Sequence, residues 1–249
     1  MNKSNERKMG VVLSYVAIII NIVIQLLYTP LLIRKLGQSE YGLYSLVASI
    51  IGYLTVMDFG FGNAIVVYTS KYKALGKIDE VKKMHGMFNV IFKIIGVIVG
   101  LLGIVLYFNV NNIFGGSMTP TEIQKMKIMM LILSFNLFLT FYFAIYNSII
   151  TAYEKFTFQK IVSIIQSLLK PMLMIPLLFL GYKSISLCII ITLANLFSIL
   201  TNYFYCKKNL QVNIKFINFD KKMFKIIFGY SIWVFLAIIV DKINWSVDN

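Results

Sequence analysis

A lysine followed by a proline lies near the middle of a long apolar stretch of this chain. Lys170 and Pro171 belong to the apolar run Ile161–Tyr182, in which Lys170 is the only charged residue. A charged side chain at bilayer depth costs several kcal/mol, so such residues usually face a polar cavity or a partner. The pattern therefore points to a membrane protein with a polar interior, and to a transporter rather than an inert anchor.

A second apolar run, Leu43–Tyr68, carries a single acidic residue beside two glycines. Asp58, Gly60 and Gly62 together predict a bent or broken helix, because glycines at bilayer depth allow local unwinding and close packing. Asp58 is a candidate for coupling to a proton or sodium ion, or for pairing with a cation in the cavity. The alternative is a residue that satisfies backbone N–H groups at the helix break. Asn63 would share this polar patch.

The remaining polar residues give weaker signals. Arg34 follows Pro30 at the end of the first apolar run, where it could stand at a cavity mouth or anchor the helix at the interface. His85 is the only histidine and has no Cys or acidic cluster at metal-ligand spacing, so we expect a solvated loop residue, no metal site and no cofactor. Membrane-bound transferases need a membrane-facing histidine or paired carboxylates, which the apolar runs lack, so we predict no enzyme activity.

The elements that must position these residues are long apolar helices. The chain has 249 residues, of which 59% are hydrophobic, and a mean hydropathy of +0.79. We predict an all-α, polytopic transmembrane helix bundle with six complete spans and part of a seventh. The seventh run reaches only from Ile226 to Val240, fifteen residues, which is short for a complete span. The six complete runs are Val11–Ile33, Leu43–Tyr68, Phe88–Phe108, Ile128–Ile150, Ile161–Tyr182 and Ile185–Tyr205.

The basic residues predict the orientation of these spans. A formal charge of +14 suggests nucleic acid at first, but the charges lie between apolar runs, so we expect no nucleic-acid partner. Sixteen basic residues fall in one alternate set of connections and five in the other, so by the positive-inside rule the N-terminus is cytoplasmic. The larger set is Lys3, Arg7, Lys8, Lys71, Lys73, Lys77, Lys82, Lys83, Lys155, Lys160, Lys207, Lys208, Lys215, Lys221, Lys222 and Lys225; the smaller is Arg34, Lys35, Lys125, Lys127 and Lys183.

Several short motifs along the chain form a recognisable set. They are PLLIRKLG at 30–37, EYGLY at 40–44, DFGFGNA at 58–64, AYEKF at 152–156, KP at 170–171 and DKIN at 241–244. In this order they resemble segments of bacterial lipid-linked oligosaccharide flippases, which carry repeat units of O-antigen or capsule and belong to the multidrug/oligosaccharidyl-lipid/polysaccharide exporter superfamily. The chain lacks an arginine that many relatives carry close to Val67.

The resemblance implies a flippase that moves an undecaprenyl-diphosphate-linked oligosaccharide across the bacterial cytoplasmic membrane by alternating access. Fixed cations suit a desolvated diphosphate, and a membrane carboxylate suits ion coupling. The implied partners are membrane lipids, the lipid-linked oligosaccharide and other polysaccharide assembly proteins. The implied substrate-binding residues are Lys170, Arg34 and Lys242; the implied ion-coupling or cavity residues are Asp58, Asn63 and Asp241.

The same resemblance sets the expected domain organisation. Relatives have two helical lobes, so residues 1–225 correspond to the first lobe and residues 226–249 to a truncated start of the second. Two other functions remain open at this stage. One is a drug/cation antiporter of the same superfamily, in which acidic cavity groups are typical. The other is a non-transporting membrane subunit of a polysaccharide assembly complex.

The predicted orientation can be tested by cysteine labelling in intact cells. A single cysteine at Gln38 or Ser117 should react with a membrane-impermeant thiol reagent, because both positions fall in connections poor in basic residues. A cysteine at Lys77 should react only after the cells are permeabilised. Labelling of position 77 in intact cells would reverse the orientation.

Overall fold

The computed structural model of the chain describes residues 3–247, with side chains at residue 6 and residues 8–241. The described part is built from helices and contains no strand, as expected for an all-α bundle. The helices are α1 (Lys3–Leu36), α2 (Gln38–Leu54), η1 (Thr55–Asp58), α3 (Phe61–Ala74), α4 (Ile78–Phe114), α5 (Pro120–Tyr142), α6 (Ala144–Ala152), α7 (Phe156–Phe179), α8 (Ser184–Lys208) and α9 (Lys221–Val247).

Seven segments of the described chain are long and apolar enough to cross a membrane. The seventh, Lys221–Asp241, has 21 residues and is longer than the fifteen-residue apolar run from which we expected part of a seventh span. The reason lies at the start of α9, where three lysines, Lys221, Lys222 and Lys225, belong to the helix itself. Long lysine side chains can reach the membrane surface from a helix that continues into the bilayer, so the apolar run alone underestimates its length.

The predicted break in the second span is confirmed. The helix ends at Leu54, continues as the short 3-10 helix η1, and restarts at Phe61 after two residues with positive φ, Phe59 and Gly60. A side chain could not fit at Gly60, because an added Cβ would lie 2.9 Å from the carbonyl oxygen of Ser231 in α9. Glycine at this position therefore allows both the left-handed backbone and the close approach of α9.

The fourth apolar run is also interrupted, which the sequence pattern did not indicate. It forms α5 and the shorter α6, separated at Phe143. The sequence Thr119-Pro120-Thr121-Glu122 predicts a capping box at the start of α5, and the structure confirms it: Thr119 Oγ1 accepts from the Glu122 backbone N–H, and Glu122 accepts from the Thr119 backbone N–H at 3.0 Å. Pro120 takes the first helical position, where its missing N–H costs nothing.

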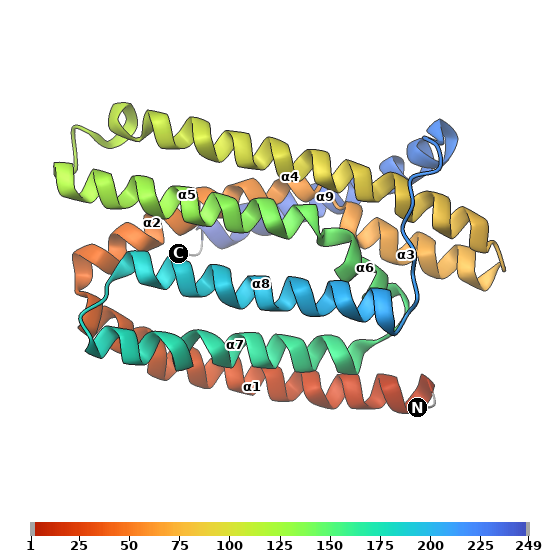
Figure 1. The fold of residues 1–249 in the computed structure, drawn as a ribbon, viewed down its shortest axis with the longest axis horizontal. Helices are drawn as coiled ribbons and strands as arrows, with labels where there is room; N and C mark the ends of the chain where they lie inside the picture. The colour runs from red at the N-terminus through yellow and green to blue at the C-terminus, as the bar shows by residue number, and fades with distance from the viewer. Residues whose placement is uncertain (1–2, 248–249) are drawn as a thin grey trace.

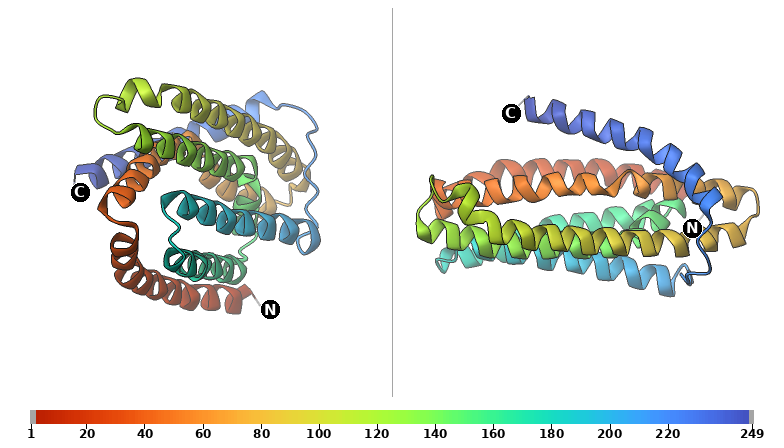
Figure 2. Two further views of the ribbon diagram at one scale, coloured as in Figure 1. Left: turned by 60° about the vertical axis from the view of Figure 1, so that its left-hand side comes forward. Right: turned by 90° about the horizontal axis from the view of Figure 1, so that it is seen from above.

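The long helices lie side by side along the longest axis of the molecule (Figure 1). The most extensive packing pairs α4 with α5 and α1 with α7, and α8 packs against both α5 and α7. Small residues let α4 and α5 approach closely: a Cβ on Gly103 would lie 2.2 Å from the side chain of Ser134. Figure 2 shows α9 on the outside, leaning away from its neighbours towards the C-terminus, and its main contacts are with α3 and η1.

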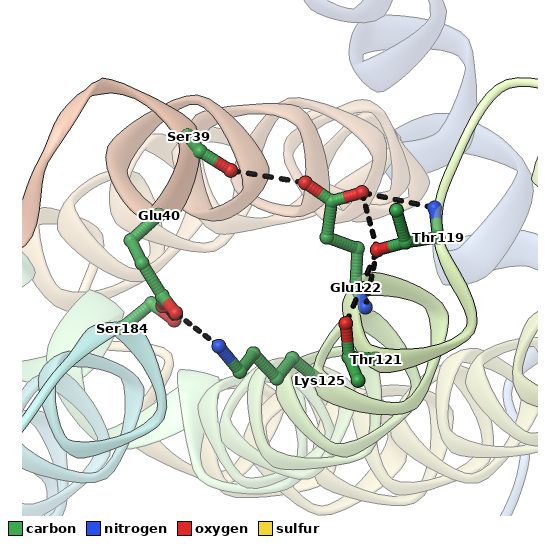
Figure 3. A network of polar contacts seen from close by, with 7 residues as sticks. All are labelled: Ser39, Glu40, Thr119, Thr121, Glu122, Lys125 and Ser184. Carbon is green, nitrogen blue, oxygen red and sulfur yellow. Dashed lines mark hydrogen bonds and ion pairs between the residues drawn. The ribbon is translucent and has the colours of Figure 1, made fainter.

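The two ends of the bundle differ in their polar groups. At one end α1, α4, α7 and α9 begin and α3 and α8 end; it carries the larger set of lysines and is called the basic end below. At the opposite end, Glu40 of α2 is 7% exposed, pairs with Lys125 of α5 and accepts a hydrogen bond from Ser184 of α8 (Figure 3). Ser39 donates to Glu122 at 3.0 Å beside this pair. The Glu40 carboxylate thus joins α2, α5 and α8.

The expectation of a solvated loop histidine is wrong. His85 lies in α4 and is 2% exposed, and its Nε2 is 2.9 Å from the Thr69 hydroxyl oxygen of α3. The helix starts at Ile78, well before the apolar run that the sequence showed. Acidic residues in the first turn, Asp79 and Glu80, favour this early start because they interact well with the helix dipole.

Replacing Glu40 should weaken the opposite end of the bundle. Glu40→Gln removes the charge that balances Lys125, and we expect a loss of about 1–3 kcal/mol in unfolding free energy, measured as a lower unfolding temperature in detergent micelles. Asp79→Asn is the matched control, because the Asp79 and Lys82 side chains are 87% and 59% exposed and such pairs contribute about 0–1 kcal/mol. Equal shifts in the two variants would contradict a structural role for Glu40.

Candidate functional site

A polar cavity of about 480 Å³ lies inside the bundle between α3, α6, α7 and α8, with contributions from η1 and α5. Its lining consists mainly of amide and hydroxyl side chains. Among the described lining residues, Asp58 is the only charged one. The polar lining residues are Asp58, Asn63, Thr140, Asn147, Ser148, Thr151, Gln159, Ser163, Gln166, Asn195, Ser198 and Asn202.

Helical periodicity brings these side chains together. In α7 the polar lining positions are 159, 163 and 166, and in α8 they are 195, 198 and 202. Steps of three and four residues fall on one face of a helix, so each helix presents a polar stripe to the cavity. Both stripes lie in the half of the bundle near the basic end. These residues escaped the sequence analysis, which weighed charged groups, although the spacing of Asn, Gln and Ser within the apolar runs was the available signal.

Hydrogen bonds hold several of these amides in place. Asn195 of α8 donates to Asn136 Oδ1 at 2.6 Å and to Thr140 Oγ1 at 2.7 Å, both in α5. Gln159 of α7 donates to Thr151 Oγ1 at 2.7 Å and to Asn147 Oδ1 at 3.0 Å. These bonds connect α5 with α8 and α6 with α7 across the cavity wall. These bonds set the orientation of the amides in the wall.

One amide oxygen lacks such a partner. Asn202 Oδ1 is buried and accepts no hydrogen bond from the described residues. A buried polar atom of this kind usually bonds to water or to a ligand. Asn202 belongs to the cavity lining, so this oxygen without a partner lies in the cavity wall.

Asp58 reaches the cavity from the helix break. Its carboxylate accepts from the backbone N–H groups of Gly60 and Gly62 at the start of α3, where the helix dipole also favours negative charge. A Cβ on Gly62 would lie 3.5 Å from both carboxylate oxygens and 3.6 Å from the Ser148 hydroxyl oxygen. Asp58 thus satisfies backbone groups at the break and faces the cavity, so the two interpretations from sequence are compatible.

The structure brings some of the sequence-predicted residues together. Asp58 and Asn63 line the same cavity. Lys170 does not line it, but lies in α7 four residues after the lining residue Gln166, hence on the same helical face and about 6 Å further along the axis. The helix continues through Pro171, and Lys170 is half-buried.

The other predicted residues lie elsewhere. Arg34 is exposed in the last turn of α1, at the opposite end from the basic half that holds the cavity. Asp241 is exposed in α9, and among the residues whose side chains are described, none from α9 lines the cavity. The Lys242 side chain lies outside the described residues. Arg34 and Asp241 therefore do not join Asp58 and Asn63 in one site.

A bundle of membrane-length helices around a polar, amide-lined cavity defines a polytopic membrane protein of transporter type. Residues 8–249 match the family model described as "Polysaccharide biosynthesis protein", and the chain belongs to this family. This family consists of transporter-type membrane proteins of polysaccharide biosynthesis. No curated protein and no solved structure matches the chain.

Water in the cavity can be tested by comparing two positions on α7. A cysteine at Ser163, which lines the cavity, should react with a charged methanethiosulfonate reagent, because reaction needs a hydrated thiolate. A cysteine at Ile165 should react slowly. Ile165 is 39% exposed but does not line the cavity, so it faces lipid. The native Cys188 and Cys206 are buried and should add little background. Equal reaction rates would contradict a hydrated cavity.

Proposed function

We propose that the chain carries the glycan of a lipid-linked oligosaccharide across the bacterial cytoplasmic membrane as part of an alternating-access flippase. The observation that carries the proposal is the amide- and hydroxyl-lined cavity within a membrane bundle of the polysaccharide biosynthesis family. No bond of the substrate is made or broken in such a step. The N-terminus is cytoplasmic in this proposal, as the distribution of lysines predicts.

The chemistry of the cavity suits sugar hydroxyls. Each sugar hydroxyl both donates and accepts, and the Asn and Gln side chains offer both functions on one planar group. Asn147, Gln166 and Asn202 present such groups from three different helices. A polar sugar that leaves water needs these hydrogen bonds, because an unpaired polar group in an apolar environment costs several kcal/mol.

The diphosphate of the carrier lipid needs a different partner. The only charged group among the described cavity residues, Asp58, would repel it. Lys170, one turn beyond Gln166 on the same face of α7, offers a positive charge next to the sugar-binding surface. We assign Lys170 to the diphosphate and the amide-lined cavity to the adjoining sugars. Arg34 and Lys242 remain proposed contacts at other stages of transport.

Asp58 is the proposed ion-coupling residue, with Asn63 beside it and Asp241 as a further proposed polar group. A carboxylate in a membrane cavity can bind a proton or sodium ion, and its neighbours Ser148 and Asn147 add uncharged oxygens. The same carboxylate favours a second candidate function, the drug/cation antiporter. Drug resistance that is lost in Asp58→Asn while surface polysaccharide is unchanged would support this second function.

The charge of Lys170 should be required for export. The variants replace the gene in its native host. We expect Lys170→Arg to keep most surface polysaccharide and Lys170→Gln to reduce it at least tenfold, which corresponds to about 1.4 kcal/mol. The reason is that a desolvated diphosphate needs a countercharge. Surface polysaccharide is measured at matched levels of membrane-inserted protein.

Lys93→Gln is the matched control. Lys93 is another lysine within a span, but its ammonium lies over the ring of Tyr142 and not at the cavity. This variant should export normally. Equal export from Lys170→Arg and Lys170→Gln would show that Lys170 only satisfies helix carbonyls near Pro171, and would remove it from the substrate site.

A further inference from the structure

The connection between α8 and α9, residues 209–220, lies at the basic end of the bundle. It contains no helix and runs across the bundle past the beginning of α4 (Figure 1). Its backbone lies directly on α4: a Cβ on Gly86 would stand 2.2 Å from the carbonyl oxygen of Lys215. This contact has room only for glycine at position 86, so the segment packs at a defined position on α4.

A pocket of about 500 Å³ lies between this segment and the first turns of α4. Lys82 lines it from the helix and Lys215 from the segment, together with the amides of Gln211 and Asn213 and the ring of Tyr153. Apart from His85, the rest of the lining is aliphatic, including Val81 and Val212. The pocket thus combines two cationic side chains and two amide donors with an apolar wall.

The buried histidine is part of the pocket lining. His85 lines the pocket, is 2% exposed, and has Nε2 bonded to the Thr69 hydroxyl of α3. This hydrogen bond fixes the orientation of the ring in the lining. This site is separate from the amide-lined cavity, with which it shares no lining residue.

The charge of the pocket favours an anion. Asp79 is 3.3 Å from Lys82, but their side chains are 87% and 59% exposed, so solvent weakens the pair and an entering anion can compete with it. Glu80 pairs with Lys83, and Asp220 accepts from the backbone N–H groups of Lys222 and Met223 at the start of α9. None of these three carboxylates lines the pocket.

Exposed apolar side chains place the segment at a membrane surface. Phe216, Ile217 and Phe219 are 54%, 58% and 47% exposed, next to Lys215 and Lys221. Aromatic and aliphatic groups beside lysines are typical of segments that lie in the interface, with apolar side chains in the acyl region and ammonium groups among the headgroups. This placement would bring lipid headgroups to the pocket.

We propose that the pocket between α4 and the segment 209–220 binds the headgroup of an anionic phospholipid. The phosphate contacts Lys82 and Lys215, the amides of Gln211 and Asn213 contact the polar headgroup, and the acyl chains lie against Ile217 and neighbouring apolar residues. The bound lipid anchors the connection between α8 and α9 on the bundle.

The test is a lipid titration of the purified full chain in detergent, followed by native mass spectrometry. We expect the wild type to retain one phosphatidylglycerol in preference to phosphatidylcholine. Lys82→Gln/Lys215→Gln should bind phosphatidylglycerol roughly tenfold or more weakly, because it removes both lysines that line the pocket. Lys83→Gln/Lys225→Gln is the control: it removes the same charge from the same end, and neither residue lines the pocket, so affinity should not change.

Three results would overturn the proposal. They are equal loss of lipid in the two double variants, equal retention of phosphatidylcholine and phosphatidylglycerol, and displacement of the lipid by millimolar inorganic phosphate, which would make the site one for free phosphate. Gly86→Ala provides a second variant that keeps every lysine. It displaces the segment from α4 and should also weaken lipid binding. Lys215→Gln alone, at an exposed position, covers the case in which the double variant does not fold.

Discussion

The absence of water from the hydrocarbon core is the constraint on which this structure depends. Backbone polar groups must be satisfied within each segment, which makes every membrane-length element a helix. Polar side chains must then meet one another or a hydrated space. The amides of α5, α6, α7 and α8 do both: Asn195 and Gln159 bond to neighbouring helices, while Gln166 and Asn202 line the cavity. The cavity and the helix contacts are two results of the same requirement.

The break in the second span shows how a local defect becomes part of the site. Unwinding at Phe59 and Gly60 frees backbone N–H groups at the start of α3. Asp58 accepts from Gly60 and Gly62, so its charge is held where the helix dipole favours it and where it also faces the cavity. Gly60 adds a second function, since only a residue without a side chain lets Ser231 of α9 approach. Gly60 thus allows the backbone turn, donates to Asp58 and makes room for α9.

The ends of the bundle are stabilised differently, and this asymmetry fits a protein with two distinct membrane faces. At one end a buried carboxylate, Glu40, joins α2, α5 and α8 through Lys125 and Ser184. At the basic end the connection between α8 and α9 rests on Gly86, with lysines around it and apolar side chains exposed. The first end relies on charges paired within the protein. The second leaves lysines such as Lys215 exposed, as a charged membrane surface requires.

The sequence by itself determined the helical membrane class, six of the seven spans, the break at Asp58 and the capping box at Thr119, because apolar length, glycine at bilayer depth and cap chemistry are local properties. Tertiary structure decided what depends on neighbours. It buried His85 against Thr69, extended α9 through its lysines, and gathered uncharged amides from separate helices into one cavity. It also left Arg34 and Asp241 away from that cavity. A charged residue stands out in an apolar run, whereas a set of single Asn, Gln and Ser residues becomes a site only when helix packing turns their faces towards each other.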